Sequence, residues 1–365
     1  MILKISGGIL MLLTIVGTLL SFSKSEAWYI RILDFPRLQL FFIGFIGIIT
    51  FSFPGINSLI EYAFIFSALA SVLFQGSKIF PYTFLHKKQV KNSTKNKTGT
   101  GKSICVVICN VRMKNKNYSA TLLVLKKADP DLILLVETNS WWEKHTRELE
   151  KNYPYSVKIP LENTYGMILY SRLKLIDPEI NFLVEKDIPS IETIVELQSG
   201  DKVHFYGVHP RPPAPSKSGS SLPRDIELLL IAEETKKKTL PVIVAGDLND
   251  VAWSYTTHLF QNTSGLFDPR VGRGMFSTYH AGVPMFRWPL DHLFHSNHFQ
   301  LIEMKRLENI DSDHFPILIS LHYEPGLKFS HSTPQPSSEE KKDARQKLRK
   351  AERSGNTMRS KNNTP

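Results

Sequence analysis

Hydrophobic and polar residues divide the chain into an apolar N-terminal region, an alternating central region and a polar C-terminal region. Near the N-terminus, three stretches rich in Leu, Ile, Phe and Gly contain no charged side chain: residues 5–23, 38–53 and 62–77. Each approaches the ~20 residues that a helix needs to cross a bilayer. The pattern therefore predicts a membrane anchor of two or three helices in contact with the lipid bilayer.

Two properties of this anchor stay open in the sequence. The first stretch follows Lys4 and precedes Ser25-Glu26-Ala27, which is also the layout of a cleavable signal peptide, but the two later apolar stretches favour a retained helix. Lys and Arg residues lie in the first loop and after the last stretch. Three spans would place both on one side, which the positive-inside tendency makes cytoplasmic, whereas two spans reverse the inference. We expect a multi-pass protein of the cell (inner) membrane.

Between residues 103 and 323, short apolar runs alternate with amphipathic segments, which is typical of an α/β fold. Apolar runs that predict buried strands lie at residues 104–109, 132–136, 166–170, 203–208, 242–245 and 315–321. Helical patterns lie at residues 118–128, 140–150 and 222–238. Pro130 and Pro241 follow the first and the last of these, where a proline is expected to end a helix.

Charge separates this α/β region from its flanks. Residues 1–102 carry 11 Lys/Arg and 3 Asp/Glu, a net charge of +8, and residues 323–365 carry 10 and 5, a net charge of +5. Residues 103–322 carry 24 and 26, a net charge of −2. The overall +11 therefore does not indicate a basic stripe that follows duplex DNA.

Together these patterns predict four parts. They are a membrane anchor at residues 1–80, a Lys-rich linker at 81–102, a catalytic domain at 103–323 and a basic tail at 324–365. The tail has few apolar side chains and is expected to be disordered, apart from a helical pattern at residues 338–352.

Polar side chains stand at the ends of the predicted strands. They are Asn110 in CNVRMKN, Glu137 in LLVETN, His209 in YGVHPRPP, Asp247 and Asn249 in AGDLND, Asp291 in PLDH, and Asp313 and His314 in SDHFP. Strand ends are where α/β proteins usually place their chemistry. An ordinary core has no use for such a set, so it predicts a metal-assisted hydrolase.

The residue types suit hydrolysis of a phosphodiester, which is anionic and needs cations and hydrogen-bond donors at its oxygens. Mg²⁺ prefers carboxylate and amide oxygens, so Glu137 and Asn110 are candidate ligands; a solvated acid and a turn-forming Asn are the alternatives. Asp247 and Asn249 alternate along an extended segment and can point the same way, although an Asx-turn would use the same residues. Asp250 is expected to cap a helix that begins near Ala252.

In this order, the motifs resemble the endonuclease/exonuclease/phosphatase (DNase I-like) superfamily over residues 103–322. The N-terminal spans make the chain similar to a membrane-anchored bacterial subgroup. The resemblance implies a four-layer α/β/β/α sandwich preceded by transmembrane helices. It also implies metal binding by Asn110, Glu137 and Asp313, and catalytic roles for His209, Asp247, Asn249, Asp291 and His314.

Among these roles, the resemblance implies that Asp247 positions or deprotonates the attacking water and that Asp291 fixes the tautomer of His314. Whether His314 or Asp247 is the base stays open. Three further residues are candidates for substrate contact: Arg211 in a proline-rich loop, and Arg287 with Trp288 before PLDH.

The sequence therefore predicts an enzyme that uses Mg²⁺, with Mn²⁺ as a substitute, to cleave a phosphodiester. A nuclease ranks slightly above a sphingomyelinase-like or phosphoinositide enzyme, so the substrate is a nucleic acid or a lipid headgroup. Two further alternatives are a catalytically inactive membrane scaffold of the same fold and a membrane protein whose basic tail recruits nucleic acid while the folded domain is structural.

Overall fold

The computed structural model describes residues 1–23, 25–94, 101–215, 219–326, 333–353 and 360–362. It divides into two compact units. The helical unit comprises residues 1–87, 213–221 and 272–274, and the α/β unit comprises residues 88–212, 222–271 and 275–365.

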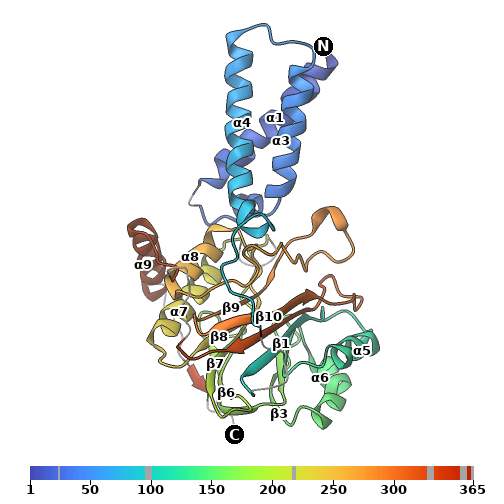
Figure 1. Cartoon of the computed structure of the whole chain (residues 1–365), viewed down its shortest axis with the longest axis vertical. Coiled ribbons are helices and arrows are strands. Elements are labelled where there is room, and N and C mark those ends of the chain that lie inside the picture. Colours follow the sequence, from blue (N-terminus) through green and yellow to red (C-terminus); the bar gives the residue numbers. More distant parts are fainter. Residues whose placement is uncertain (24, 95–100, 216–218, 327–332, 354–359, 363–365) are drawn as a thin grey trace. The chain divides into compact units, whose positions relative to one another are not determined.

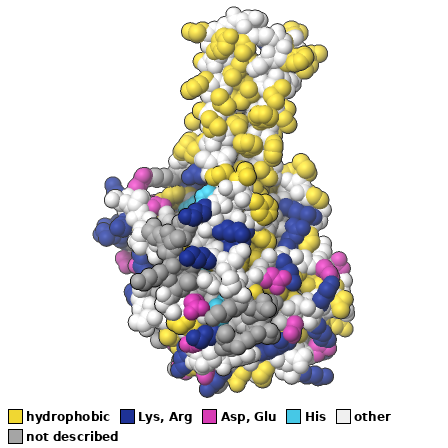
Figure 2. Space-filling model, in the orientation of Figure 1, with side chains coloured by type: hydrophobic (Ala, Val, Ile, Leu, Met, Phe, Trp, Pro, Cys, Tyr) yellow, Lys and Arg dark blue, Asp and Glu magenta, His cyan; other side chains and the backbone are white. Residues whose placement is uncertain are grey.

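The helical unit is built from apolar helices. Its elements are α1 (Ile2–Ser21), α2 (Trp28–Arg31), η1 (Ile32–Asp34), α3 (Arg37–Ser52), α4 (Leu59–Ile79) and η2 (Phe80–Tyr82). Two stretches, Ile2–Ser21 and Leu59–Tyr82, are long and apolar enough to cross a membrane, and a third is added if α2–η1 and α3, bent by 71°, count as one span. Many apolar side chains are exposed on the face of this unit that Figure 2 shows, which agrees with the expected anchor.

Glycines allow α1 and α3 to pack closely. A Cβ atom on Gly7 would lie 2.5 Å from the backbone nitrogen of Phe51, and one on Gly47 would lie 2.9 Å from the Cβ of Leu10. Small residues at such crossings let helix backbones approach where lipid gives no hydrophobic driving force. The glycine content of the apolar stretches therefore has a packing role.

The described part of the α/β unit contains two six-stranded mixed sheets. The first has the order β10-β11-β1-β2-β4-β3, and its strands are β1 (Ser103–Asn110), β2 (Leu132–Val136), β3 (Tyr155–Ile159), β4 (Met167–Ser171), β10 (Phe299–Arg306) and β11 (Ile317–Tyr323). The second has the order β12-β5-β6-β7-β8-β9, and its strands are β5 (Lys174–Phe182), β6 (Ser190–Glu196), β7 (Lys202–Val208), β8 (Val242–Asp247), β9 (Asp291–His295) and β12 (Ser360–Asn362).

Helices cover the outer face of each sheet, and the inner faces pack together (Figure 1). On the first sheet lie α5 (Tyr118–Ala128), α6 (Ser140–Thr146) and η3 (Arg147–Lys151). On the second lie α7 (Leu222–Lys237) and α8 (Tyr255–Ser264). The remaining elements are η4 (Pro284–Phe286) and α9 (Ser338–Arg353). This arrangement confirms the predicted four-layer α/β/β/α sandwich.

All six apolar runs form strands, and six further strands in the described part of the chain were not predicted as apolar runs. Of these, β3, β5, β6 and β10 are only partly buried and carry charged residues, so they lack a continuous apolar run. β9 is buried but has only five residues, three of them Asp or His, and β12 has only three residues. β5 also contains Pro178, and its pairing with β6 shifts register between Ile176 and Glu179. Edge and bulged strands of this kind give a weak sequence signal.

The C-terminal tail contains the predicted helix and one further segment of secondary structure. Helix α9 forms over Ser338–Arg353, which confirms the helical pattern at residues 338–352, and Ala344, Lys347 and Ala351 on one face are buried against α7 and α8. Residues 360–362 pair with β5, which departs from the expected disorder of the rest of the tail. The remainder of the tail lies partly outside the described residues.

A buried acid on α7 gives a testable dependence of stability on pH. Glu227 is 4% exposed, its Oε1 has no hydrogen-bond partner among the described residues, and burial, followed by repulsion from Glu185, raises its pKa to about 8. Because the folded protein favours the protonated carboxyl group of Glu227, this group contributes stability fully below about pH 4.5. The contribution is lost as pH rises through 8, where the buried group must ionise. We expect Glu227→Gln to gain a few kcal/mol over wild type between pH 5 and 9, measured by thermal melting. Exposed Glu233→Gln is the control, and a difference independent of pH would contradict the assignment.

Candidate active site

The polar strand ends meet at one edge of the sandwich. β1 and β2 are parallel neighbours in the first sheet, as β7 and β8 are in the second, so their carboxyl ends lie on the same side within each sheet. β9 and β11 run antiparallel to β8 and β1, which places the start of each beside those ends. Asp291 is the register partner of Asp247. Strand topology thus gathers the six motifs.

Asn110 links the two sheets. Its Nδ2 donates to Glu137 Oε1 at 2.9 Å and to Asp247 Oδ2 at 3.0 Å, and its Oδ1 accepts from the backbone amide of Arg112. Both N–H groups and the oxygen atom of the Asn110 side chain therefore form hydrogen bonds within the site. An amide can bridge two carboxylates in this way because it places its NH₂ group between them.

Glu137 stands on a turn with φ of +59° directly after β2. Burial raises the pKa of its carboxyl group above the usual range, and the nearby Asp313 carboxylate adds to this rise. Its Oε2 accepts weakly from the amide of Met113 at 3.4 Å. A partly buried pair of acids is the environment that a divalent cation would neutralise.

Asp247 lies between two imidazoles. Its Oδ2 is 3.9 Å from His209 Nε2 and 3.6 Å from His314 Nε2, and its Oδ1 accepts from the backbone amide of Asn249 at 2.9 Å. Burial raises the pKa of Asp247, the attraction of His314 and His209 opposes this rise, and Asp291 adds to it. The carboxylate is fixed from three directions.

His314 is held by Asp291, whose Oδ2 lies 2.8 Å from His314 Nδ1. Burial alone would lower the pKa of His314, but attraction from Asp291 and Asp247 outweighs it and raises the pKa to about 10. The imidazole is therefore protonated at neutral pH and presents its Nε2–H toward Asp247.

Ligand atoms of Asp247, Asp291 and His314 lie within 4.8 Å of one another, the spacing of a metal site, and this is the one such group among the described residues. Binding of a cation by His314 would require this imidazole to lose its proton. Mg²⁺ also prefers oxygen atoms. Glu137, Asn110 and Asp313 offer oxygen atoms of the kind that this ion prefers. They adjoin the group through Asn110, which donates to Glu137 and Asp247, and through Arg112, whose amide donates to Asn110 and whose Nε lies 3.6 Å from Asp313 Oδ2.

The segment after β8 differs from its prediction in one respect. Helix α8 begins later than expected, and Ser254 caps it by accepting from the amide of Thr257. Asp250 instead accepts from Ser254 Oγ at 2.7 Å and lies 3.0 Å from Arg224. The expectation that Asp250 caps the helix is therefore wrong, since a buried arginine on α7 supplies a stronger partner.

The three candidate substrate contacts have partners within the protein. Arg211 pairs with Glu185 at 2.8 Å and Asp187 at 3.3 Å. Arg287 donates to backbone carbonyls of the same loop, including that of Ala281 at 2.9 Å. Trp288 stacks on Tyr279 with ring centroids 6.3 Å apart. Their roles stay predictions.

Two aromatic residues that were not predicted line the site. The ring of Tyr279 lies 4.9 Å from the ring of His314, and the ring of Tyr165 lies 5.5 Å from that of His209. Both come from loops without a strand-end signal. Aromatic rings beside imidazoles restrict their orientation and exclude water.

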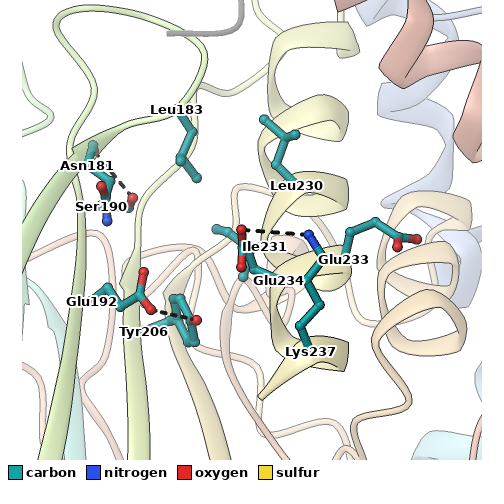
Figure 3. Close-up of a pocket in the computed structure, with 10 residues that line it drawn as sticks. All are labelled: Asn181, Leu183, Ser190, Glu192, Tyr206, Leu230, Ile231, Glu233, Glu234 and Lys237. Atoms are coloured by element: carbon teal, nitrogen blue, oxygen red, sulfur yellow. Dashed lines mark hydrogen bonds and ion pairs between the residues drawn. The ribbon is translucent and has the colours of Figure 1, made fainter. Parts of the chain in front are cut away.

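A separate cavity of about 320 Å³ lies between α7 and the outer face of β5–β7 (Figure 3). Three acids line it, and one of them, Glu192, accepts from Tyr206 Oη at 2.9 Å and from Lys238 at 2.7 Å. The ammonium group of Lys238 offsets the charge of this carboxylate. None of the predicted site residues lines this cavity, so it is distinct from the candidate active site.

The four-layer sandwich and the buried Asp–Asp–His group, together with a match to a family model, show a phosphohydrolase fold. The chain belongs to the Endonuclease/Exonuclease/phosphatase family, whose model matches residues 108–314, more than half of the sequence. Among curated proteins, none matches it.

Solved structures share the fold. Humanized TDP2 of D. rerio, carrying 14 mutations, has a TM-score of 0.53 and 16% identity, with 60% of this chain and 99% of that chain covered. D. rerio TDP2 complexed with a single-strand DNA product has a TM-score of 0.50 and 18% identity, with 60% and 99% covered. At these identities the likeness is one of fold.

Proposed function

We propose that the protein is a membrane-anchored, Mg²⁺-dependent phosphohydrolase that cleaves a phosphodiester by in-line attack of water. The proposal rests above all on the surroundings of Asp247, whose Oδ2 accepts from Asn110 and faces His209 Nε2 and His314 Nε2. A carboxylate between two imidazoles can hold a water molecule beside a phosphate whose oxygens the imidazoles contact.

The protonation states favour Asp247 over His314 as the base. His314 carries a proton at neutral pH because its pKa is raised to about 10 by Asp291 and Asp247 against the effect of burial. It therefore donates to a phosphate oxygen and stabilises the charge that develops there, while Asp247 accepts the proton of the water. Asp291 keeps the Nδ1 of His314 engaged and so fixes the direction of its Nε2–H.

We propose that His209 and Asn249 also donate to the phosphate. The Nδ2 of Asn249 already donates to the carbonyl of Pro210 at 3.0 Å, which ties its side chain to the loop that follows His209. An amide nitrogen has a second hydrogen for the substrate. The two residues thus act together.

Mg²⁺ fits the oxygen donors of Glu137, Asn110 and Asp313, and Mn²⁺ is expected to substitute for it. When bound, the ion would polarise the phosphate and neutralise charge on the departing oxygen. The raised pKa of Glu137, caused mainly by burial, is consistent with a carboxylate that awaits a cation.

A nucleic acid ranks first as substrate. The fold-matched TDP2 structure holds a single-strand DNA product, whereas the net charge of −2 over residues 103–322 supplies no basic stripe for a duplex groove. A lipid headgroup is the second candidate. Val283, Met285 and Phe286 are 39%, 73% and 52% exposed, and Phe286 contacts the Trp288–Tyr279 stack beside His314. An exposed apolar loop of this kind suits a lipid surface.

We place the apolar N-terminal helices in the cell membrane, as in the membrane-anchored bacterial subgroup that the sequence resembles. With three spans, the positive-inside tendency puts the α/β unit on the cytoplasmic side. Accessibility of a cysteine introduced at an exposed position of the α/β unit, labelled in intact cells and in inverted vesicles, tests this side.

The activity is tested on the full chain in detergent with Mg²⁺, Mn²⁺ or EDTA. The substrates are single-stranded DNA, plasmid DNA, RNA, sphingomyelin, phosphoinositides and bis-p-nitrophenyl phosphate. We expect EDTA to lower the rate by at least about 10³-fold, because the ion contributes several kcal/mol to the transition state. Turnover that is unchanged in EDTA, or no turnover of any substrate by a folded protein that binds Mg²⁺, would overturn the proposal.

A further inference from the structure

A buried ionic network lies beneath the segment Asp247–Asp250, hereafter the catalytic loop. On one side of the loop, Arg224 of α7 donates through Nη1 to the carbonyl of Asn249 at 2.8 Å and lies 3.0 Å from Asp250 Oδ2. On the other side, the carbonyl of Asp250 accepts from His292 Nε2 at 2.9 Å. The backbone of the loop is therefore held by α7 and β9 together.

The network continues from Arg224 to the C-terminal helix. Arg224 contacts Asp225 Oδ1 at 3.3 Å, and Lys347 of α9 donates to Asp225 Oδ2 at 2.8 Å. Thr256 of α8 also donates to Asp225 Oδ1, at 3.0 Å. The side chains of Arg224, Asp225 and Lys347 are 1%, 1% and 4% exposed, so α9 contributes a buried cation.

The buried charges of the network balance. The buried cations are Arg224, Arg270 and Lys347, and the buried anions are Asp225, Asp250 and Asp268; Lys347 also lies 3.6 Å from Asp343, which is 16% exposed. Arg270 pairs with Asp268 and with His292 Nδ1. With three buried charges of each sign, removal of Lys347 leaves one buried negative charge in excess where water does not enter, which is costly.

We propose that Lys347 is a positioning residue for the active site, and that α9 completes the support of the catalytic loop through Asp225 and Arg224. The guanidinium group of Arg224 contacts both Asp225 and the catalytic loop. Without Lys347, Asp225 draws Arg224 toward itself and away from the carbonyl of Asn249. In the absence of this cation, the loop loses a contact although no residue of the site has changed.

The loop needs such support because of its backbone. Asn249 has φ of +52°, in the left-handed region, which costs free energy unless surrounding contacts hold it. Its amide donates to Asp247 Oδ1 at 2.9 Å. A shift of Asn249 therefore turns the carboxylate that faces His209 and His314. Coupling runs from Lys347 through Asp225, Arg224 and Asn249 to Asp247.

The state of Asp225 agrees with this view. Burial alone would raise the pKa of its carboxyl group, but attraction from Lys347 and Arg224 outweighs burial and lowers the pKa below the usual value. The carboxylate is thus charged in the folded protein and depends on both cations. If Lys347 served only to hold α9 in place, it would not act on the same carboxylate as Arg224.

The test compares Lys347→Met with Lys342→Met in the full chain in detergent. Lys342 lies on the exposed face of the same helix, so the control removes an equal charge. The first readout is amide hydrogen exchange over residues 247–251, well below the melting temperature. The second is hydrolysis of bis-p-nitrophenyl phosphate with Mg²⁺. This second readout rests on the proposed function, whereas the first does not.

We expect Lys347→Met to raise exchange in the loop about tenfold and to lower kcat about tenfold, with KM unchanged. Adding Asp225→Asn should restore both to within about threefold, because Asn keeps an oxygen for Arg224 and Thr256 while the charge balance returns. Loop exchange and kcat equal to wild type in Lys347→Met would overturn the proposal, even if melting fell.

Two outcomes separate this inference from the proposed function. If wild type hydrolyses nothing, the proposed function fails, and loop exchange alone still decides the role of Lys347. If Lys347→Met does not fold, Lys347→Gln, which keeps a donor to Asp225, is compared with Lys342→Gln by the same two readouts. Equal loop exchange in these two variants would count against the role of the charge.

Discussion

Glu137→Gln is expected to lower kcat by at least about 10³-fold while the protein stays folded. Gln keeps an oxygen that can accept from Asn110 Nδ2, as Glu137 Oε1 does at 2.9 Å, so the shape of the site is retained. It removes the negative charge that would hold Mg²⁺, and with it the several kcal/mol that the ion contributes. Burial raises the pKa of Glu137, so loss of this charge does not destabilise the metal-free fold.

Thermal melting with and without Mg²⁺ separates metal binding from folding. In wild type, saturating Mg²⁺ at 100 times its Kd should add about 2.7 kcal/mol of stability, and this gain should disappear in Glu137→Gln. The matched control is Glu148→Gln, at an acid of η3 that pairs with Lys126 on the surface. If Glu137→Gln kept its full rate or its Mg²⁺-dependent stabilisation, the metal assignment would be wrong.

Much of the fold was readable because the central strands are continuous apolar runs. β1 and β2 are buried on both faces; β1 ends at Asn110, and Glu137 directly follows β2. The signal fails at β5, where Pro178 and neighbouring acids interrupt the run. Periodicity therefore predicts the centre of a sheet better than its margins.

The site was predictable only where its residues are marked locally. Asp247, Asp291 and His314 stand in short motifs, and the structure brings them together. Tyr279 reaches His314 from a loop, and nothing in its neighbours indicates this. Lys347 is 122 positions from Asp225 and lies among other cations of α9, so only tertiary contact distinguishes it. Residues that act through another residue leave no mark on a single sequence.

Asp247→Asn and His314→Gln are each expected to lower kcat by about 10³- to 10⁴-fold, because one accepts the proton of the water and the other donates to the phosphate. Asp247 Oδ2 lies 3.6 Å from His314 Nε2, and each group shifts the pKa of the other. Asp247 helps raise the pKa of His314, and His314 opposes the rise that burial causes in the pKa of Asp247. They should therefore behave as a unit.

Non-additivity is the measurable sign of that unit. Independent residues would give a double variant whose loss is the product of the two single losses, whereas groups that act together lose little more than either alone. We expect the double variant to fall within about tenfold of the slower single variant, with KM near that of wild type. A loss equal to the product would show that Asp247 and His314 serve separate steps, and His314 would then return as a candidate for the base.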